Sequence, residues 1–455
     1  MQMRSISLLS CLLGLVLVLP ASGQQASPAA TDQTVQASAA AAADAAPATA
    51  APAQDTQAPA ATSAAAPTWS VGPIDFSGEV DAYYQWNFNH PANRQTGLAN
   101  FAIPANQFSL EAIELGLAHT PDPIGFEVDL GYGKTFQVVN SFDNDRGFNQ
   151  YVRQAFVSLK PMKTHGFEFD FGKFVTTSGA EVIESYTNWN YSHSLLFAWA
   201  IPYYHFGFRT SWPMGKHWVG GFQVVNGWNN LVDNNSGKTL GVNLTGTFKK
   251  FAWVGDWYGG PENPNTNSGW RNLFDTTLTL TPSSKVSVYI NYDYGQNRNF
   301  NQSFLFLPPT GPARVAFADG SLARWQGVAG ALHLQATSKW AFTPRVEWFD
   351  DRSGFQMLGA GADSFGTGVV SVNNIVPVPQ QVKEVTITGE YKVLEGLMFR
   401  AEYRHDWSNR AFFERGQPAC VGFTVTTCPA DFGLGNSKKQ DTVALAFIAF
   451  FGPKR

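Results

Sequence analysis

The sequence predicts an all-β protein: a transmembrane antiparallel up-and-down β-barrel of about 16 strands (14–18), preceded by a signal peptide and a disordered linker. Three observations predict this class. The composition is rich in aromatic residues and glycine but poor in charge. Long segments alternate apolar and polar residues, and short connections alternate with long ones.

The composition itself separates several classes of protein. Of 455 residues, 15% are charged, 14% are aromatic and 42 are glycine, and the mean hydropathy is −0.16. Strands with one apolar and one polar face give such an average, because the two faces cancel. A large secreted β-solenoid would share much of this profile. The net charge of −4 leaves no basic excess, so no nucleic-acid partner is expected.

The first residues read as export signals. Residues 1–23 carry Arg4, an apolar run over 6–19 and small residues at 20–23, which together predict a cleaved signal peptide. Residues 24–68 are rich in Ala and Pro and contain no Lys or Arg, so we expect a disordered periplasmic linker that serves as a tether or a plain spacer. Residues 69–455 then form the barrel domain, located in a bacterial outer membrane.

The first predicted strand, 74–88, shows the alternation most clearly. One face is apolar throughout, and the other carries three carboxylates, because a strand has a period of two residues. The same alternation predicts strands over 126–133, 167–172, 205–212, 240–248, 286–294, 385–392 and 397–407. Seven short turns and eight long loops lie between strands, which predicts sixteen strands with short turns on the periplasmic side.

Two further features concern the apolar faces. Aromatic residues stand beside the short turns, as expected for rings at a membrane interface; they are Trp212, Trp218, Phe248, Phe251, Trp340 and Phe342. The last strand, 440–451, is apolar on both faces, and its Phe450-Phe451 pair is followed by Gly-Pro-Lys-Arg. That ending departs from the terminal aromatic residue typical of exported barrels.

Charged residues on the polar faces are predicted to line a water-filled lumen. They could set opposite charges on opposite walls, because the acids come from early strands and the arginines from later ones, or they could simply pair with each other. Lys173 is left out, since it shares parity with the outward Phe171. The predicted lining residues are Asp75, Glu79, Asp81, Glu127, Asp129, Glu168, Asp170, Arg209, Arg345, Arg400 and Arg404.

The long loop 176–200 is the candidate for a constriction. Residues 179–185 have a helix-compatible composition after Thr177 or Ser178, which would put Glu181 and Glu184 on one helix face. Trp189 and Tyr191 could anchor the loop against the inner wall. We expect the loop to fold inward and to narrow the pore; a surface loop is the alternative.

Other chemistry has weak support. Cys420 and Cys428 are candidates for a local disulfide, or they are two unpaired thiols. The histidines are scattered and no catalytic grouping or metal-ligand spacing is present, so we predict no enzyme activity, no cofactor and no metal.

Seven stretches give the chain its resemblance to a known family: DFGKF at 170–174, GAEVIES at 179–185, NWNY at 188–191, SLLF at 194–197, AIP at 200–202, VNGWNN at 225–230 and RHDWSN at 404–409. Over about 77–450 the chain resembles the β-barrel porin-2 family, also called OmpL-like. The resemblance implies a porin-like barrel but no particular solute.

Together these observations predict passive diffusion of small hydrophilic solutes through the outer membrane. The partners would be membrane lipid and solute, with a homotrimer as the oligomeric state common among sixteen-stranded porins. The alternatives are a structural or adhesive barrel with a plugged lumen and an outer-membrane enzyme.

Overall fold

The structure is a computed structural model, and it describes residues 69–141, 147–301, 317–357, 379–416 and 436–452. The predicted signal peptide and linker, residues 1–68, lie outside the described residues. The same is true of Cys420 and Cys428, so their disulfide stays a prediction.

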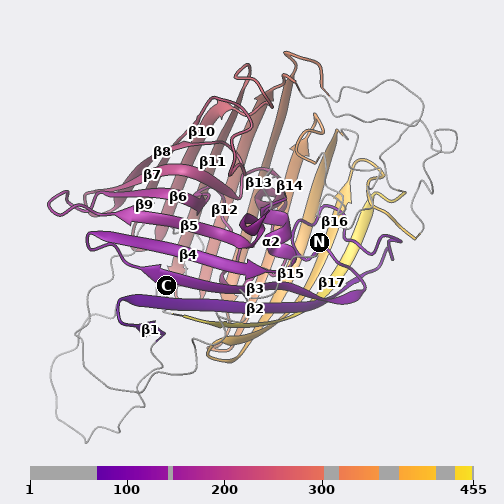
Figure 1. Cartoon of the computed structure of the whole chain (residues 1–455). Helices are drawn as coiled ribbons and strands as arrows, with labels where there is room; N and C mark the ends of the chain where they lie inside the picture. Colours follow the sequence, from indigo (N-terminus) through magenta and orange to yellow (C-terminus); the bar gives the residue numbers. More distant parts are fainter. Residues whose placement is uncertain (1–68, 142–146, 302–316, 358–378, 417–435, 453–455) are drawn as a thin grey trace, which may run out of the picture. The chain divides into compact units, whose positions relative to one another are not determined.

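The described residues form one antiparallel sheet in which neighbours in the chain are neighbours in space (Figure 1). β1 is a short addition that pairs only with the start of β2. The strands are β1 (Ser70–Val71), β2 (Ile74–Asn87), β3 (Gln107–His119), β4 (Ile124–Tyr132), β5 (Val152–Leu159), β6 (Glu168–Val175), β7 (Tyr204–Met214), β8 (Trp218–Val225), β9 (Thr239–Thr247), β10 (Phe251–Pro261), β11 (Trp270–Ser283), β12 (Val286–Arg298), β13 (Leu322–Gln335), β14 (Trp340–Asp351), β15 (Gln380–Leu394), β16 (Leu397–Ser408) and β17 (Lys439–Phe451).

The sheet closes on itself. β17 pairs with β2 in antiparallel register, with Phe447 opposite Ala82, so that the strands β2 to β17 form a continuous wall without a free edge. Closure satisfies every strand's backbone hydrogen bonds within the sheet, which a strand crossing lipid requires. The predicted closed barrel of sixteen strands is therefore confirmed.

The alternation of connections is confirmed as well. Short turns at 120–123, 160–167, 215–217, 248–250, 284–285, 336–339 and 395–396 lie at one end of the wall. Longer connections at 88–106, 133–151, 176–203, 226–238, 262–269, 299–321, 352–379 and 409–438 lie at the other end.

Helical turns occur only inside long connections of the described chain. α2 (Lys134–Val139) and the 3₁₀ turn η2 (Phe148–Tyr151) follow β4, and the 3₁₀ turn η3 (Ser185–Thr187) and α3 (Leu195–Trp199) follow β6. Among the described residues, no helix has both the length and the apolar character needed to cross a membrane.

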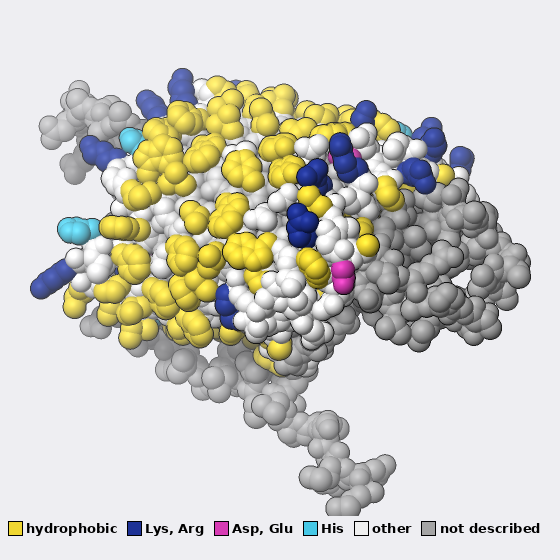
Figure 2. Space-filling view, turned by 90° about the horizontal axis from the view of Figure 1, so that it is seen from above, with side chains coloured by type: hydrophobic (Ala, Val, Ile, Leu, Met, Phe, Trp, Pro, Cys, Tyr) yellow, Lys and Arg dark blue, Asp and Glu magenta, His cyan; other side chains and the backbone are white. Residues whose placement is uncertain are grey.

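The wall is inverted relative to a soluble protein. Along β2, Val80 and Trp86 are exposed, while the alternating polar residues Glu79, Asp81 and Gln85 are buried. The same arrangement recurs around the barrel, and Figure 2 shows apolar side chains gathered over one face of the wall. Apolar outward faces and polar inward faces are the pattern of a barrel that meets lipid.

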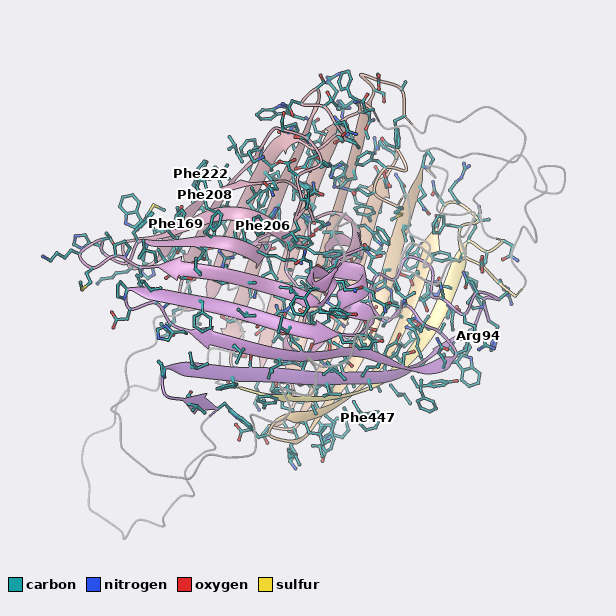
Figure 3. All side chains as sticks on the ribbon, viewed as in Figure 1. Arg94, Phe169, Phe206, Phe208, Phe222 and Phe447 are labelled. Atoms are coloured by element: carbon teal, nitrogen blue, oxygen red, sulfur yellow. The ribbon has the colours of Figure 1, made fainter. Side chains whose placement is uncertain are left out.

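Aromatic rings are prominent on this outer surface. Figure 3 labels Phe169, Phe206, Phe208 and Phe222 on β6, β7 and β8. Phe208 lies between Phe169 and Phe222, with ring centroids 5.6 Å and 6.4 Å away. The predicted rings beside the short turns, such as Trp212 and Trp340, are exposed too. Aromatic rings on the outer surface beside the short turns are typical of the level where a barrel meets the lipid headgroups.

The inner side of the barrel holds the apolar core. Its largest cluster joins inward residues of the wall, such as Trp325 and Phe349, to described residues of six long connections, which are 88–106, 133–151, 176–203, 226–238, 352–379 and 409–438. The connection 176–203 lies very close to the wall at Gly327 of β13, because a Cβ at that position would be only 2.7 Å from Leu196 Cδ1. Described residues of six long connections therefore contribute to the apolar core, and the connection 176–203 supplies the largest share.

The orientation of the wall predicts the effect of a charge on its outer face. Val346 is an exposed residue in the middle of β14. Val346→Arg should lower the free energy of unfolding in lipid vesicles by about 2–4 kcal/mol, because hydrocarbon cannot solvate the guanidinium. Urea unfolding of the vesicle-inserted protein measures this. Val346→Leu is the control and should change little; equal effects of the two variants would contradict the outward placement.

Candidate functional site

The candidate site is the barrel interior, and its central element is the connection between β6 and β7. We call residues 176–203 the inward loop. The loop leaves and re-enters the wall at a closed base, where Thr176 N donates to Tyr203 O at 3.0 Å. Between these ends it contacts β2, β5, β10, β12, β14, β15 and β16, so it reaches across the lumen.

Arg400 of β16 holds the first half of the inward loop by its backbone. Its guanidinium donates to the carbonyl oxygens of Ser185 and Asn188, both at 2.5 Å. Its remaining charge is balanced by Glu390 on β15, at 2.7 Å. Five fixed donors in one planar group can satisfy several carbonyls and a carboxylate together.

Arg345 of β14 does the same for the second half and is fully buried. It donates to the carbonyl of Ser192 at 2.7 Å. Three carboxylates surround it: Glu181 of the loop at 2.8 Å, Glu347 at 3.0 Å and Glu384 at 3.1 Å. Buried charges are tolerated when they are paired and hydrogen-bonded in this way.

Carboxylates of the same wall accept from the loop's amides. Glu402 accepts from Tyr191 N at 2.6 Å and from Ser192 N at 2.9 Å. Glu347 accepts from Leu195 N, the first residue of α3, at 2.7 Å. Hydrogen bonds to charged groups are stronger than neutral ones, so β14–β16 hold the loop by its main chain.

The inward loop is also attached to strands on both sides of β14–β16. Asp81 of β2 accepts from Ser185 Oγ at 2.6 Å and from Tyr191 Oη at 3.1 Å. Thr177 Oγ1 donates to Asp256 of β10 at 2.5 Å. Trp189 packs its ring against Tyr289 of β12, with centroids 5.3 Å apart. All the predicted loop residues therefore contact the inner wall.

The predicted helix over 179–185 is wrong. No helix is assigned there, and Glu184 has an extended backbone before η3. Glu181 contacts Arg345 on β14, whereas Glu184 lies 2.6 Å from Arg153 on β5. Two arginines on separate strands pull the two carboxylates apart, and a helix would have put them on one face.

The predicted lining residues all belong to inward faces, and most are paired. Arg209 lies 2.8 Å from Asp170, Arg404 lies 2.8 Å from Asp406, and Asp129 lies 2.8 Å from Arg153. Glu127 accepts from Gln154, Glu168 lies 3.8 Å from Lys160, and Asp75 accepts from Ser70.

This pairing bears on the two predictions for the wall charges, which were opposite charges on opposite walls or mutual pairing. Arg345, Arg400 and Arg404 do share one wall, but each has a carboxylate partner on that same wall. Close pairs cancel most of each other's field at a distance. The geometry therefore favours the alternative, in which wall charges are mutually paired.

Sequence reasoning missed Arg153, which binds Glu114, Asp129 and Glu184. The register between β4 and β5 shifts beside it, since Asp129 pairs with Gln154 while Leu130 pairs with Val152. A bulge adds one residue and breaks the simple alternation, so parity could not assign its side chain.

Lys173 is a second omission. It is buried, and its ammonium donates to Val152 O at 2.7 Å and Asn140 Oδ1 at 2.5 Å, and lies 4.1 Å from the centre of the Tyr204 ring. Its parity with the outward Phe171 holds, because it lies opposite Phe206 in the register of β6 and β7. The sequence did not show that its side chain is buried. Connections fold over this end of β6, so both faces are buried there.

A third omission is a row of carboxylates on β10, β11 and β12. Asp256 is directly opposite Asp275, and Asp275 is directly opposite Asp293. We call these three residues the aspartate row. All are buried. Asp293 stands on the polar face of a predicted strand, but the register between strands was needed to align the three.

One small cavity lies between β2, β3 and the inward loop. It measures about 10 Å³, room for roughly one water molecule. Its polar lining includes Glu79, Asp81, Glu111, Thr135 and Ser185. Within the described part of the chain, no three His, Cys, Asp or Glu side chains are arranged to hold a metal ion.

His193 lies at the tip of the inward loop between aromatic rings. Its ring centroid is 4.1 Å from that of Phe101 and 4.8 Å from that of Phe197, and its Nε2 lies 2.7 Å from Val182 O. Burial lowers the pKa of His193 below its usual 6.5. The imidazole is therefore neutral near pH 7 and donates from Nε2.

Comparison with known proteins agrees with this geometry. The family model described as "Putative beta-barrel porin-2, OmpL-like" matches residues 73–451. None of the curated proteins compared with the sequence is a match.

Among solved structures, an anion-selective porin from Comamonas acidovorans is similar in fold, with 9% identity, 83% of this chain and 99% of that chain covered, and a TM-score of 0.50. The Salmonella typhi OmpF complex with daunomycin has 14% identity, coverage of 83% and 97%, and a TM-score of 0.49. The outer-membrane channel DcaP of Acinetobacter baumannii has 11% identity, coverage of 83% and 97%, and a TM-score of 0.48.

The role of Arg400 as a loop anchor is testable by Arg400→Met. The variant leaves Glu390 and the loop carbonyls buried without their donor, which should lower the free energy of unfolding by about 3–5 kcal/mol. Urea unfolding in vesicles measures it. Arg324→Met removes an exposed arginine of β13 and should have little effect. Similar small losses in both variants would argue against the anchor.

His193 predicts a pH dependence of stability. Since its pKa is lowered in the folded state, the unfolded state alone takes up the proton as the pH falls below 6.5. Acidification from about pH 7 to about pH 5 should therefore cost about 1 kcal/mol of stability through this group. His193→Gln should lose that part of the dependence, whereas His217→Gln, at an exposed histidine, should keep it.

Proposed function

We propose a function for this chain on the basis of its family: the chain belongs to the β-barrel porin-2, OmpL-like, family. It is an outer-membrane channel built on a closed antiparallel barrel. We infer that this channel conducts small hydrophilic solutes by passive diffusion, and that the inward loop forms its constriction.

One observation carries the inference about the constriction: the loop's main chain is fixed to the wall by charged side chains on β14 and β16. Arg345, Arg400 and Glu402 all contact backbone atoms of the loop. A loop held this way keeps one position in the lumen, so it sets the width of the passage at all times.

The character of the inner wall supports a hydrophilic solute. The inward residues of β11, β12 and β15 include polar side chains such as Thr277, Asn291 and Thr388, and Thr388 accepts a hydrogen bond from Asn190 of the loop. Polar side chains replace part of a solute's hydration shell, and a narrow passage admits only small solutes. Small polar molecules and ions are therefore the expected cargo.

A barrel with a closed lumen is the second candidate, and one observation favours it. The inward loop reaches walls on several sides, with Tyr191 on β2 and β16, Thr177 on β10 and Trp189 on β12. A loop seated on all these strands could seal the barrel, and the barrel would then serve as a structural or adhesive protein.

Other parts of the assignment follow from the family. Porin membership supports a channel without enzyme activity, located in the outer membrane. Cleavage of a signal peptide after residue 23, contact with membrane lipid and a homotrimer are further proposals. The exposed apolar wall is compatible with lipid and with neighbouring copies alike.

Planar-bilayer recording tests the proposal. The wild-type protein should give discrete channels of low conductance. Replacing 177–202 by a short Gly/Ser turn, which the contact between Thr176 and Tyr203 allows, should raise single-channel conductance about twofold or more. The control is the same replacement at 263–268, in a loop outside the barrel interior.

Each outcome separates the candidates. A wild-type protein that never conducts, together with a loop-replaced protein that does, would establish the closed barrel. Equal conductance of wild type and loop-replaced protein would remove the inward loop as the constriction while leaving the channel itself.

A further inference from the structure

The interior contains far more negative than positive charge. Among the described residues, eighteen buried Asp and Glu side chains stand against six buried Lys and Arg side chains. The six cations already have carboxylate, carbonyl or amide partners, as described above. Some of the surplus carboxylates are compensated by cations that are not buried, as Asp350 is by Arg352, or by backbone amides, as Asp351 is. The remaining carboxylates form no salt bridge with a cation of the described wall.

The surplus is most concentrated in the aspartate row. Asp256, Asp275 and Asp293 face one another across three neighbouring strands. Among the described residues, none of the three forms a salt bridge, although every buried arginine does. Asp275 does accept from Asn291 Nδ2 at 2.7 Å, and Asp256 accepts from Thr177.

Asp293 is the least satisfied member. It is fully buried, and its hydrogen-bond partner is the carboxyl group of Asp275 in the same row. Among the described residues, no amide, alcohol or cationic group donates to its carboxylate oxygens. Asp256 Oδ2 and Asp275 Oδ1 also lack such a donor. Gln223 lies near the row, since its amide nitrogen is 3.4 Å from Thr177 Oγ1. Its Oε1 receives no hydrogen bond among the described residues, so it is a further, uncharged acceptor there.

Such an arrangement is unfavourable while all three carboxylates are ionised. A proton shared between Asp275 and Asp293 relieves part of the repulsion, and the negative charge that remains attracts positive charge. A buried carboxylate without a partner is costly, and adjacent carboxylates repel each other. In a water-filled passage, mobile cations can supply the missing charge, and a lumen lined by one sign of charge concentrates ions of the opposite sign.

We propose that the channel prefers cations over anions and that the aspartate row determines this preference. The proposal rests on the proposed conducting function and deepens it by naming the class of solute: small monovalent cations and small cationic molecules. The row does not chelate an ion. Its members are buried, so it acts through the electrostatic field that it produces in the passage.

The inward loop contributes to the placement of the row. Thr177 donates to Asp256 at the point where the loop leaves β6, so the row lies beside the start of the constriction. Further along the same sheet, beyond β13, the arginines of β14 and β16 are engaged with carboxylates and loop carbonyls. They are therefore not available to attract anions.

The test is the zero-current potential of channels in a planar bilayer under an about tenfold KCl gradient. The wild-type protein should give the sign that denotes K⁺ preference. Asp275→Asn/Asp293→Asn keeps side-chain size and should lower the K⁺/Cl⁻ permeability ratio by a factor of about two to three for each charge removed. Asp122→Asn, in the exposed turn between β3 and β4, is the matched control and should keep the wild-type ratio.

The failures are distinguishable. Channels that are unselective or prefer Cl⁻ in the wild type would overturn the inference while the conducting function stands. A double variant that conducts with the wild-type ratio would remove the aspartate row as its determinant. No current from either the wild type or the loop-replaced protein would instead overturn the proposed conducting function. Because the wild-type potential is itself informative, the test does not depend on the folding of the variant.

Discussion

The structure depends on where the backbone of the inward loop finds its hydrogen bonds. A chain segment inside a barrel is cut off from much of the solvent, and its amides and carbonyls need partners. Arg345, Arg400 and Glu402 supply these partners from the wall. Neighbouring carboxylates then balance the arginines. The charged interior of this barrel is thus in large part the binding site of its own loop.

This constraint also explains the apolar residues that point inward. A lumen filled only with water would favour polar residues there, yet Ala446 and Ile448 of β17 are buried on the inner side. They pack in one cluster with Tyr191 of the loop, and Phe450 stacks on Tyr186 with centroids 4.7 Å apart. The loop therefore meets an apolar part of the wall at β17 and charged parts on the neighbouring strands, where carboxylates accept its hydrogen bonds.

Much of the fold could be predicted from the sequence, because the period of two and the alternation of connections are local properties. Strand number, closure and the inward position of residues such as Asp81 and Arg345 all followed from them. The failures arose where local rules stop. The bulge at Arg153 changed parity, partners on separate strands kept 179–185 from forming a helix, and the aspartate row required cross-strand register. The apolar inner face of the last strand did carry a signal, since such a face needs something apolar inside the barrel to pack against.

Tyr191 has a position that reaches beyond its role in the loop. Its amide binds Glu402 on β16 and its hydroxyl binds Asp81 on β2, so a single residue bridges the two strands that flank β17. β17 is the strand at which the first and last parts of the wall meet. The loop thus bridges the closure of the barrel from inside. Its binding to the wall is coupled to the pairing of the first and last strands, and it adds side-chain contacts to a closure that otherwise depends on backbone hydrogen bonds.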